Sequence, residues 1–498
     1  MIGISHSTEK RAIIDIGSNT VRLVVYNGPP RAPVVILNEK VNARLGKDLG
    51  KTGTISEKSM RAALSALARF AAMLRLMQVA NVECVATAAT RDARNGPEFL
   101  EAVRGFGLSP RLLSGGQEAQ ASATGVIAAF PHAHGIAADL GGGSLELVEI
   151  GGPNGEAEVG TSGITLPFGT LRLPDLRSAG PAKFAATVRE SLAARRWDKG
   201  RGQPLYIVGG SWRALALQAM RVLDWPVDDP HGFELSAGDA LRLAQQFEKD
   251  KLVNPDPRIS NARLATLPDA AALLVQIITC LEPSRLVFSS WGLREGLLHM
   301  QLPEKIRQES PMLASVAAFA LGARVSAEAA SRIAAWTAPV CREEAQDGDL
   351  RQAATLLALA AMRTEPNMRT EEALSWALRK RWVGIDMRGR AMMAMTVFAN
   401  SGFTKIPPEF IRLADKADLD RAICWGLAVR LCRRLTGGAE VGLAATSLSL
   451  RDGKLVLALS EDTSSLYSSG IGKDLKALSQ WLELEWSVET AGGVLMAG

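Results

Sequence analysis

The sequence predicts an α/β protein whose core has two lobes, followed by a helical domain and a small α+β domain. The first observation is the length of 498 residues, which is too long for one ordinary hydrophobic core. The second is an internal duplication of a strand-turn-strand motif in the first part of the chain. The third is a change, from about Pro311 to Thr436, to helical patterning rich in Ala, Leu, Arg and Met.

The duplicated motif occupies residues 12–25, AIIDIGSNTVRLVV, and residues 136–149, IAADLGGGSLELVE. The alignment places Asp15 on Asp139 and Thr20 on Ser144. Each copy is typical of a hairpin, with β-rich residues before the aspartate, a turn of small residues, and apolar-polar alternation after it. We therefore expect two related hairpins with a cleft between them.

The turns have the composition of phosphate-binding loops, although each alone is equally well explained as a plain turn. Small residues leave backbone N–H groups unshielded, and such a concavity binds phosphate oxygens. A third run, LYIVGGSWRALA at 205–216, is a strand, two glycines and a helix start, which also accepts phosphate. The predicted phosphate-binding residues are Gly17, Ser18, Asn19, Thr20, Gly141, Gly142, Gly143, Ser144, Gly209 and Gly210.

The matched aspartates Asp15 and Asp139 predict a metal ion beside the turns. A carboxylate next to amides that face phosphate would repel the ligand unless a cation lay between them. Mg²⁺, which prefers hard oxygen ligands, is the natural choice.

The remaining elements divide the chain into four expected domains, the lobes at 1–128 and 129–305 and the later domains at 306–439 and 440–498. In the last domain SLSLRDGKLVLAL alternates apolar and polar residues around a strong hairpin signal, Asp452-Gly453. The other expected elements are a strand at Val34–Leu37, a helix from about Glu57 to Gln78, a strand at 82–88, and helices near 96–104 and 473–483.

Composition and charge indicate an ordinary soluble protein of the cytoplasm. Fifty-seven Lys and Arg against 52 Asp and Glu leave a net charge of +5, which favours polyanionic partners without requiring nucleic acid. No signal peptide is expected at the start, and the apolar stretch AALLVQIITCL is too short to cross a membrane. Five scattered cysteines without a CxxC pair favour free thiols over disulfides or zinc.

Two charged residues between the hairpins are candidates for chemistry. Arg91, in ATAATRDARN, follows a strand that enters the cleft, so it is either a surface charge or a bidentate phosphate contact. Glu118, in LLSGGQEAQA, lies in the first turn of a helix. It either interacts with the helix dipole or orients a water for phosphoryl transfer, for which a weak base suffices.

These motifs resemble the Ppx/GppA family of exopolyphosphatases and guanosine pentaphosphate phosphohydrolases, within the actin/hexokinase/Hsp70 ATPase superfamily. The matching segments are DIGSNTVRLVV, ATAATRDARN, LSGGQEA, DLGGGSLELV, LPFGTLRL, VGGSWRALA and WGLREGLL, in family order. The resemblance implies a duplicated actin-like (ribonuclease H-like) core and an HD-like helical domain. It also implies Mg²⁺-dependent, stepwise hydrolysis of the terminal phosphoanhydride of inorganic polyphosphate, or removal of the 5′-γ-phosphate of guanosine pentaphosphate (pppGpp).

The resemblance also assigns roles within this sequence. The family's catalytic glutamate falls on Glu118, its second acidic position on Glu146 and its phosphate arginine on Arg91. Asp139 and Asp15 would hold Mg²⁺, and Glu118 would place the attacking water. Glu146 would orient that water or add to the metal shell.

This sequence departs from the family at three points. Leu145 stands where a hydroxyl residue is usual, and Gln117 where relatives often have a second acid beside Glu118. No histidine lies beyond His299, so the helical domain cannot use the histidine-metal chemistry of a working HD site. We interpret its basic clusters, Arg379-Lys380-Arg381 and Arg430 with Arg433 and Arg434, either as a guide for a polyphosphate chain or as solvated helix faces.

Rival functions are a non-enzymatic phosphate or nucleotide sensor and a kinase-like or chaperone-like ATPase. A carboxylate that faces phosphate gives a pure binder no advantage, which argues against the sensor. The ATPase would need an adenine pocket, and no motif indicates one. Because family members often dimerise, we expect a homodimer.

Overall fold

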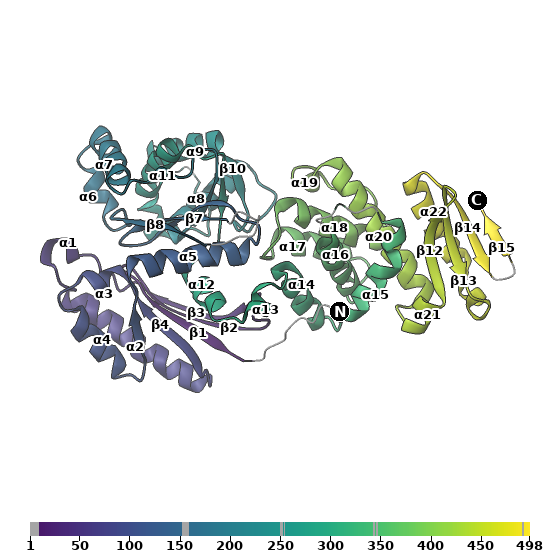
Figure 1. Cartoon of the computed structure of the whole chain (residues 1–498), viewed down its shortest axis with the longest axis horizontal. Coiled ribbons are helices and arrows are strands. Elements are labelled where there is room, and N and C mark those ends of the chain that lie inside the picture. The colour runs from purple at the N-terminus through teal and green to yellow at the C-terminus, as the bar shows by residue number, and fades with distance from the viewer. Residues whose placement is uncertain are drawn as a thin grey trace. The chain divides into compact units, whose positions relative to one another are not determined.

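The computed structural model describes residues 9–151, 159–249, 252, 254–341, 344, 347–490 and 493–498. The first eight residues, with His6 and most of the segment considered for a signal peptide, lie outside this part. The chain divides into two compact units (Figure 1). The two-lobed unit comprises the described residues up to 225 and 229–308, and the C-terminal unit comprises 226–228 and those from 309 onward.

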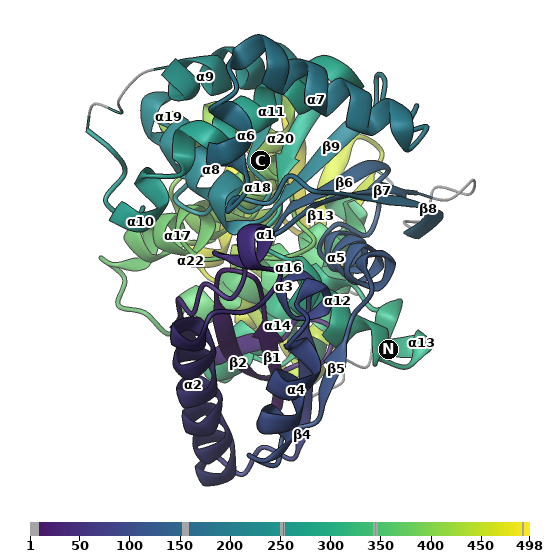
Figure 2. The ribbon, with the colours of Figure 1, turned by 90° about the vertical axis from the view of Figure 1, so that its left-hand side faces the viewer.

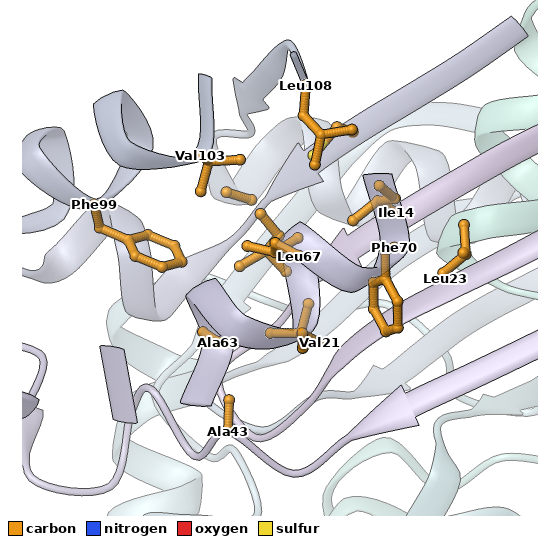
Figure 3. Packing of buried hydrophobic residues seen from close by; sticks show 14 of the residues in the cluster. Ile14, Val21, Leu23, Ala43, Ala63, Leu67, Phe70, Phe99, Val103 and Leu108 are labelled. Carbon is orange, nitrogen blue, oxygen red and sulfur yellow. The ribbon is translucent and has the colours of Figure 1, made fainter. Parts of the chain in front are cut away.

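The first lobe is built on a five-stranded sheet with the order β3-β2-β1-β4-β5. Helix α2 (Glu57–Leu76) has a buried apolar face, which contributes Leu67 and Phe70 to the core beside Phe99 of α4 (Gly96–Arg104) (Figure 3). The predicted helices and strands of this lobe are confirmed. The strands are β1 (Arg11–Ile16), β2 (Val21–Asn27), β3 (Val34–Val41), β4 (Asn81–Ala86) and β5 (Pro110–Leu112).

The second lobe repeats this arrangement in a six-stranded sheet with the order β10-β11-β9-β6-β7-β8. In both lobes the hairpin forms an antiparallel meander with the next strand, and its first strand also pairs in parallel with a later one, β4 or β9. The duplication seen in the sequence is therefore a duplication of sheet topology. The strands are β6 (Gly135–Leu140), β7 (Leu145–Ile150), β8 (Val159–Leu166), β9 (Pro204–Val208), β10 (Glu234–Ser236) and β11 (Arg285–Phe288).

Two helices cross closely beside the first sheet. Helix α5 (Gly115–Ala129) packs against α12 (Leu293–Met300), which comes from the end of the second lobe's sequence (Figures 1 and 2). A Cβ on Gly296 would lie 1.7 Å from the Ala121 carbonyl oxygen, so only glycine allows this approach. Tyr26 of β2 donates a hydrogen bond of 2.9 Å to Glu295 of α12. Helix α12 thus belongs by packing to the first lobe.

The C-terminal unit begins with helices and ends in a four-stranded sheet of order β12-β13-β14-β15. The predicted hairpin is confirmed, because Asp452 and Gly453 both have positive φ, at 49° and 74°, as a type I′ turn requires. The main elements are α14 (Pro311–Gly322), α15 (Ala327–Thr337), α16 (Gly348–Ala361), α17 (Arg369–Leu378), α18 (Met387–Asn400), α20 (Lys416–Thr436), β12 (Thr446–Arg451), β13 (Lys454–Leu459), α22 (Ser469–Leu482), β14 (Glu485–Thr490) and β15 (Gly493–Ala497).

One of the two basic clusters has a structural role in this unit. Arg430 and Arg434 of α20 bind Asp474 of α22, at 3.0 and 2.5 Å, and join the helical part to the small sheet. The HD-like character of the helices and the guidance of a polyphosphate chain stay predictions.

No single helix in the described ranges is long and apolar enough to cross a membrane. Helix α14 and the segment Ala327–Val340 reach the length and apolar composition of a membrane span only when they are taken together, and the chain bends by 114° between them.

Candidate active site

A cavity of about 530 Å³ lies in the two-lobed unit and brings most of the predicted site residues together. Arg91 and Ser144 are the two predicted residues outside its lining. The predicted residues that line it are Asp15, Gly17, Ser18, Asn19, Thr20, Glu118, Asp139, Gly141, Gly142, Gly143, Glu146, Gly209 and Gly210.

The two hairpin turns have the same backbone geometry. The Gly17 N–H donates to the Thr20 carbonyl at 3.0 Å, and the Gly141 N–H donates to the Ser144 carbonyl at 2.9 Å. The amides of Gly17 and Gly141, two of the predicted phosphate-binding residues, therefore close the turns. Within the described residues, the amides at 18–20 and 142–144 donate no hydrogen bond to the protein, so they are available to a phosphate.

The turns also touch each other across the two lobes. A Cβ on Gly143 would lie 2.8 Å from Ser18 Oγ, and one on Gly142 would lie 3.1 Å from the Asn19 nitrogen. Behind the second turn, a Cβ on Gly169 would lie 2.1 Å from the Gly143 carbonyl carbon. Gly143 and Gly169 leave no room for a Cβ where the two backbones and the supporting segment meet, and at Gly142 the contact would be tight.

The third turn begins α8 (Gly210–Val222), as the sequence predicts. Gly209 has a φ of 109°, and a Cβ there would lie 2.5 Å from the Leu140 carbonyl oxygen. Arg263 donates a hydrogen bond to the Gly210 carbonyl. The turn is thus held against the end of β6, beside the second hairpin.

Glu118 lies in the first turn of α5, where a capping box fixes the backbone. Ser114 Oγ accepts from the Gln117 N–H at 3.2 Å, and Gln117 Oε1 accepts from the Ser114 N–H at 2.9 Å. The residue at 117 thus serves the cap rather than the chemistry. Burial raises the pKa of Glu118 to about 7; Arg91 opposes this shift, and Asp139 and Asp15 add to it. Glu118 is therefore a stronger base than an ordinary glutamate.

Glu146 is the most buried acid of the site, with 3% of its surface exposed. Its Oε1 has no hydrogen-bond partner among the described residues. Burial raises the pKa of Glu146 well above its usual range, and the charges of Glu118 and Asp139 act in the same direction. An orphaned buried oxygen of this kind needs a proton or a cation.

Asp15 and Asp139 occupy equivalent places at the ends of β1 and β6. Burial raises the pKa of both carboxyl groups, which arginine side chains partly offset. Ser122, one turn after Glu118 and 3% exposed, donates a hydrogen bond to Asp139 Oδ2.

Arg91 is part of α3 (Ala88–Asp92) and lies beside Glu118 of α5. It is not among the residues that line the cavity. Its Nη1 is 3.6 Å from Glu118 Oε2 and donates to the Leu113 carbonyl at 2.9 Å. The predicted contact with phosphate stays a prediction, and the observed partner is the glutamate.

A group of cations that the sequence analysis did not single out completes the cavity. Burial and the surrounding arginines lower the pKa of Lys40, and burial lowers that of Arg22 to about 10 with a contribution from Arg294. Arg22, Arg213 and Arg294 lie in the motifs quoted above, each two to four residues after a glycine turn or an N-cap glycine. This spacing is the signal in the sequence that could have identified them. The cations are Arg22, Lys40, Arg44, Lys47, Arg213, Arg263 and Arg294.

The acids of the cavity fit a divalent metal. Among the described residues, no group of three or more His, Cys, Asp or Glu side chains converges as a ready metal site. Mg²⁺ does not need such a group, because it commonly binds through one or two carboxylates, water and substrate phosphates. The unpartnered Glu146 Oε1 and the carboxylates Asp15 and Asp139 are the hard oxygen donors that this ion takes.

The two-lobed α/β unit thus carries duplicated hairpins whose glycine turns meet beside the acids of the cavity. The model of the Ppx/GppA phosphatase family matches residues 24–305, and the chain belongs to this family. The match begins after the first turn and includes the second turn, Glu118 and the third turn.

Curated relatives carry different names. The chain is 26% identical over 334 residues to Retrograde regulation protein 2 of Saccharomyces cerevisiae, which covers 60% of this chain and 57% of the relative. It is 27% identical over 311 residues to the Guanosine-5′-triphosphate,3′-diphosphate pyrophosphatase of Aeromonas salmonicida, covering 59% and 60%. The chain thus spans less than two thirds of these proteins. An exopolyphosphatase structure from Cytophaga hutchinsonii, 23% identical, matches 59% of this chain and 97% of that one with a TM-score of 0.51, which shows the fold.

Proposed function

We propose that this protein is an exopolyphosphatase, which removes orthophosphate step by step from the end of inorganic polyphosphate. The observation that carries this proposal is the lining of one cavity. Glu118, whose pKa is raised to about 7, stands there with the free amides of two glycine turns and a set of lysine and arginine side chains. These are the groups that a hydrolysis of phosphoanhydrides needs, namely a base, a phosphate cradle and positive charge.

The residues divide the work as follows. The amides at 18–20 and 142–144 bind the oxygens of the terminal phosphates, and the cations of the cavity neutralise the chain behind them. Glu118 orients a water in line with the terminal phosphorus and accepts its proton. The new bond joins the water oxygen to phosphorus, the bridging P–O bond breaks, and the shortened chain leaves with the electron pair.

Asp139, Asp15 and Glu146 would hold Mg²⁺. Bound there, the ion would neutralise charge on the phosphate oxygens. Glu146 would contribute its Oε1, which has no hydrogen-bond partner among the described residues.

The lining favours a polyphosphate chain over pppGpp. No aromatic side chain is among the residues that line the cavity in the described part of the chain, so a guanine base has no ring on which to stack. The alternative, a pppGpp 5′-phosphohydrolase, draws support from the name of the Aeromonas salmonicida relative. For pppGpp, the guanidinium groups of arginines such as Arg22 and Arg263 would stack on the guanine base in place of an aromatic ring.

A phosphate or nucleotide sensor is the second candidate. It is favoured by the name of the yeast relative, a regulation protein. Against it stands the environment of Glu118, whose burial beside Asp139 raises the pKa and is a cost that a pure binder does not need.

The test is orthophosphate release from long polyphosphate, short polyphosphate and pppGpp, measured side by side with Mg²⁺. Glu118→Ala is expected to abolish release and to leave binding of polyphosphate, measured by calorimetry, within about threefold. The matched control is Glu98→Ala, an exposed acid in the first turn of α4. Normal release by Glu118→Ala would refute the assignment, and binding without release by the unmodified protein would favour the sensor. We also propose a homodimer, which light scattering checks.

A further inference from the structure

Glu118 is the end of a row of alternating charges that crosses from one lobe to the other. Arg91 Nη1 is 3.6 Å from Glu118, and Arg91 Nε is 3.5 Å from Asp92 Oδ1. Asp92 Oδ2 is in turn 3.5 Å from Nη2 of Arg172. Arg91 and Asp92 belong to α3 of the first lobe, whereas Arg172 follows β8 of the second. One guanidinium therefore serves two carboxylates, and one of these carboxylates is held by the opposite lobe.

The backbone before Arg172 is fixed to the second phosphate-binding turn. The Thr170 N–H donates to the Gly141 carbonyl and the Leu171 N–H to the Gly142 carbonyl, both at 3.0 Å. The Arg172 N–H closes this segment on the Gly169 carbonyl at 2.8 Å. The position of Arg172 thus follows the position of the turn.

We propose that Arg172 is a positioning residue: it neutralises Asp92, which would otherwise draw Arg91 away from Glu118, and so connects Glu118 to the second phosphate-binding turn. The inference rests on the proposed function only where it names Glu118 as the group that orients water. Asp92 and Glu118 compete for Arg91. When Arg172 neutralises Asp92, Arg91 is left to Glu118. Without Arg172, Asp92 draws the guanidinium away.

The two partners have opposite effects on Glu118. The charged groups around Glu118 are Arg91 from α3, Asp15 from β1, Asp139 from β6 and Glu146 from β7. Loss of the Asp92 charge gives Arg91 wholly to Glu118 and lowers the pKa of that glutamate. Loss of the Arg172 charge leaves Asp92 unpaired and raises it. Direct charge effects give the same two signs, but they add, whereas an effect of Arg172 that passes through Asp92 disappears once Asp92 is neutral.

The experiment compares Asp92→Asn with Arg172→Gln. The ionisation of Glu118 is followed in the free protein by infrared difference spectroscopy with ¹³C-labelled glutamate, and Glu118→Gln assigns the band. Because the Asp92 and Arg172 side chains are 41% and 44% exposed, shifts of roughly 0.5 pH unit are expected, downward for Asp92→Asn and upward for Arg172→Gln. The matched controls, Asp175→Asn and Arg195→Gln, change exposed charges elsewhere on the second lobe and are expected to leave the midpoint unchanged.

Shifts of the same sign, or none, would overturn the proposal. The measurement needs no turnover, so failure of the proposed function would be seen separately, in orthophosphate release. The double variant, Asp92→Asn with Arg172→Gln, gives the second check. If Arg172 acts through Asp92, the Glu118 midpoint of the double variant equals that of Asp92→Asn alone. Direct charge effects would instead add and return the midpoint to the original value, which would overturn the proposal.

Discussion

The two hairpins of this protein share a backbone and differ in charge. In each, a glycine N–H closes the turn, at 3.0 Å in the first and 2.9 Å in the second. In each, an aspartate is the next-to-last residue of the first strand. Opposite Asp15 in the strand register stands Arg22, whereas opposite Asp139 stands Glu146. One duplicated framework therefore presents a cation in one lobe and a second acid in the other.

This difference separates two tasks that a phosphate-processing site must combine. The first hairpin carries a counter-charge of its own: Arg294 of α12, and after it Arg22 of the hairpin, partly offset the burial that raises the pKa of Asp15. The second hairpin carries no arginine: burial, Glu118 and Asp139 raise the pKa of Glu146, Ser144 and Arg91 offset this only in part, and the Glu146 Oε1 is unpartnered among the described residues. We infer that the first hairpin serves mainly phosphate and the second mainly the metal ion.

The largest effect is expected when the second hairpin is made like the first. Glu146→Arg places a guanidinium opposite Asp139, as Arg22 stands opposite Asp15. The new cation would occupy the place of Mg²⁺ without supplying its coordination geometry, so orthophosphate release should fall by at least about 10³-fold. Release assays over a range of Mg²⁺ concentrations measure this. If added Mg²⁺ restored the rate, the second hairpin would not be the principal metal site.

The next effect compares the two aspartates directly. Asp139→Asn is expected to weaken the response to Mg²⁺ by about 100-fold, and Asp15→Asn by about tenfold, because only Asp139 has a second acid opposite it. Half-saturation by Mg²⁺ in release assays, with calorimetric Mg²⁺ binding as a check without turnover, gives both values. Equal losses would mean that the two hairpins share the ion.

Removal of the Glu146 charge should stabilise the free protein while it inactivates the enzyme. The folded state raises the pKa of Glu146, so the stability linked to this group is present below its unfolded value of about 4.3. That stability is lost as pH rises through the folded value. Glu146→Gln should therefore gain about 2 kcal/mol in free energy of unfolding at pH 8 and little at pH 4.

Urea unfolding in the presence of a metal chelator, at both pH values, measures this gain. Glu149→Gln is the matched control, since Glu149 lies in the same strand and is paired with Lys199 at 3.6 Å. A Glu146→Gln protein no more stable than the original at pH 8 would show that the buried carboxylate is not a burden on the fold.

Much of the framework was predictable from the sequence, because the duplication is local. The alternation of residues around Asp15 and Asp139 defines both hairpins, and the helix of the first lobe at 57–76 follows from its amphipathic pattern. The packing of α12 on the first lobe was not predictable in this way. It depends on glycines of two distant helices, Gly125 and Gly296, which allow close contact that no local pattern encodes.

The site was predictable in its identities and less so in its electrostatics. The motifs pointed to Glu118, Asp139 and the glycine turns, all of which line the cavity. Spacing could not show that Arg91 faces Glu118, nor that burial raises the pKa of Glu118 to about 7, because both follow from the approach of separate elements. The alignment of the two hairpins shows that Arg22 and Glu146 occupy equivalent positions. Only the strand register shows that each lies opposite an aspartate.

The smallest effect concerns a hydroxyl that binds only the aspartate of the second hairpin. Ser122 donates to Asp139 Oδ2, and no side chain of the described residues makes the equivalent hydrogen bond to Asp15. Because Ser122 lies one turn after Glu118 on α5, it fixes one oxygen of the metal-binding carboxylate to the helix that carries the base. Ser122→Ala should weaken Mg²⁺ binding about threefold to tenfold, equivalent to about 1 kcal/mol, and leave kcat at saturating Mg²⁺ nearly unchanged.

Calorimetric Mg²⁺ titration of the free protein, together with release assays, separates these two quantities. Thr124→Ala is the control, since Thr124 lies on the same helix and donates only to the Gln120 carbonyl, at 2.8 Å. A fall in kcat with unchanged Mg²⁺ binding would mean that Ser122 acts on Glu118 rather than on Asp139. In that case the stronger Mg²⁺ binding of the second hairpin would depend on Glu146 alone. The difference between the two hairpins would then come entirely from the residue opposite the aspartate, which is Arg22 in the first and Glu146 in the second.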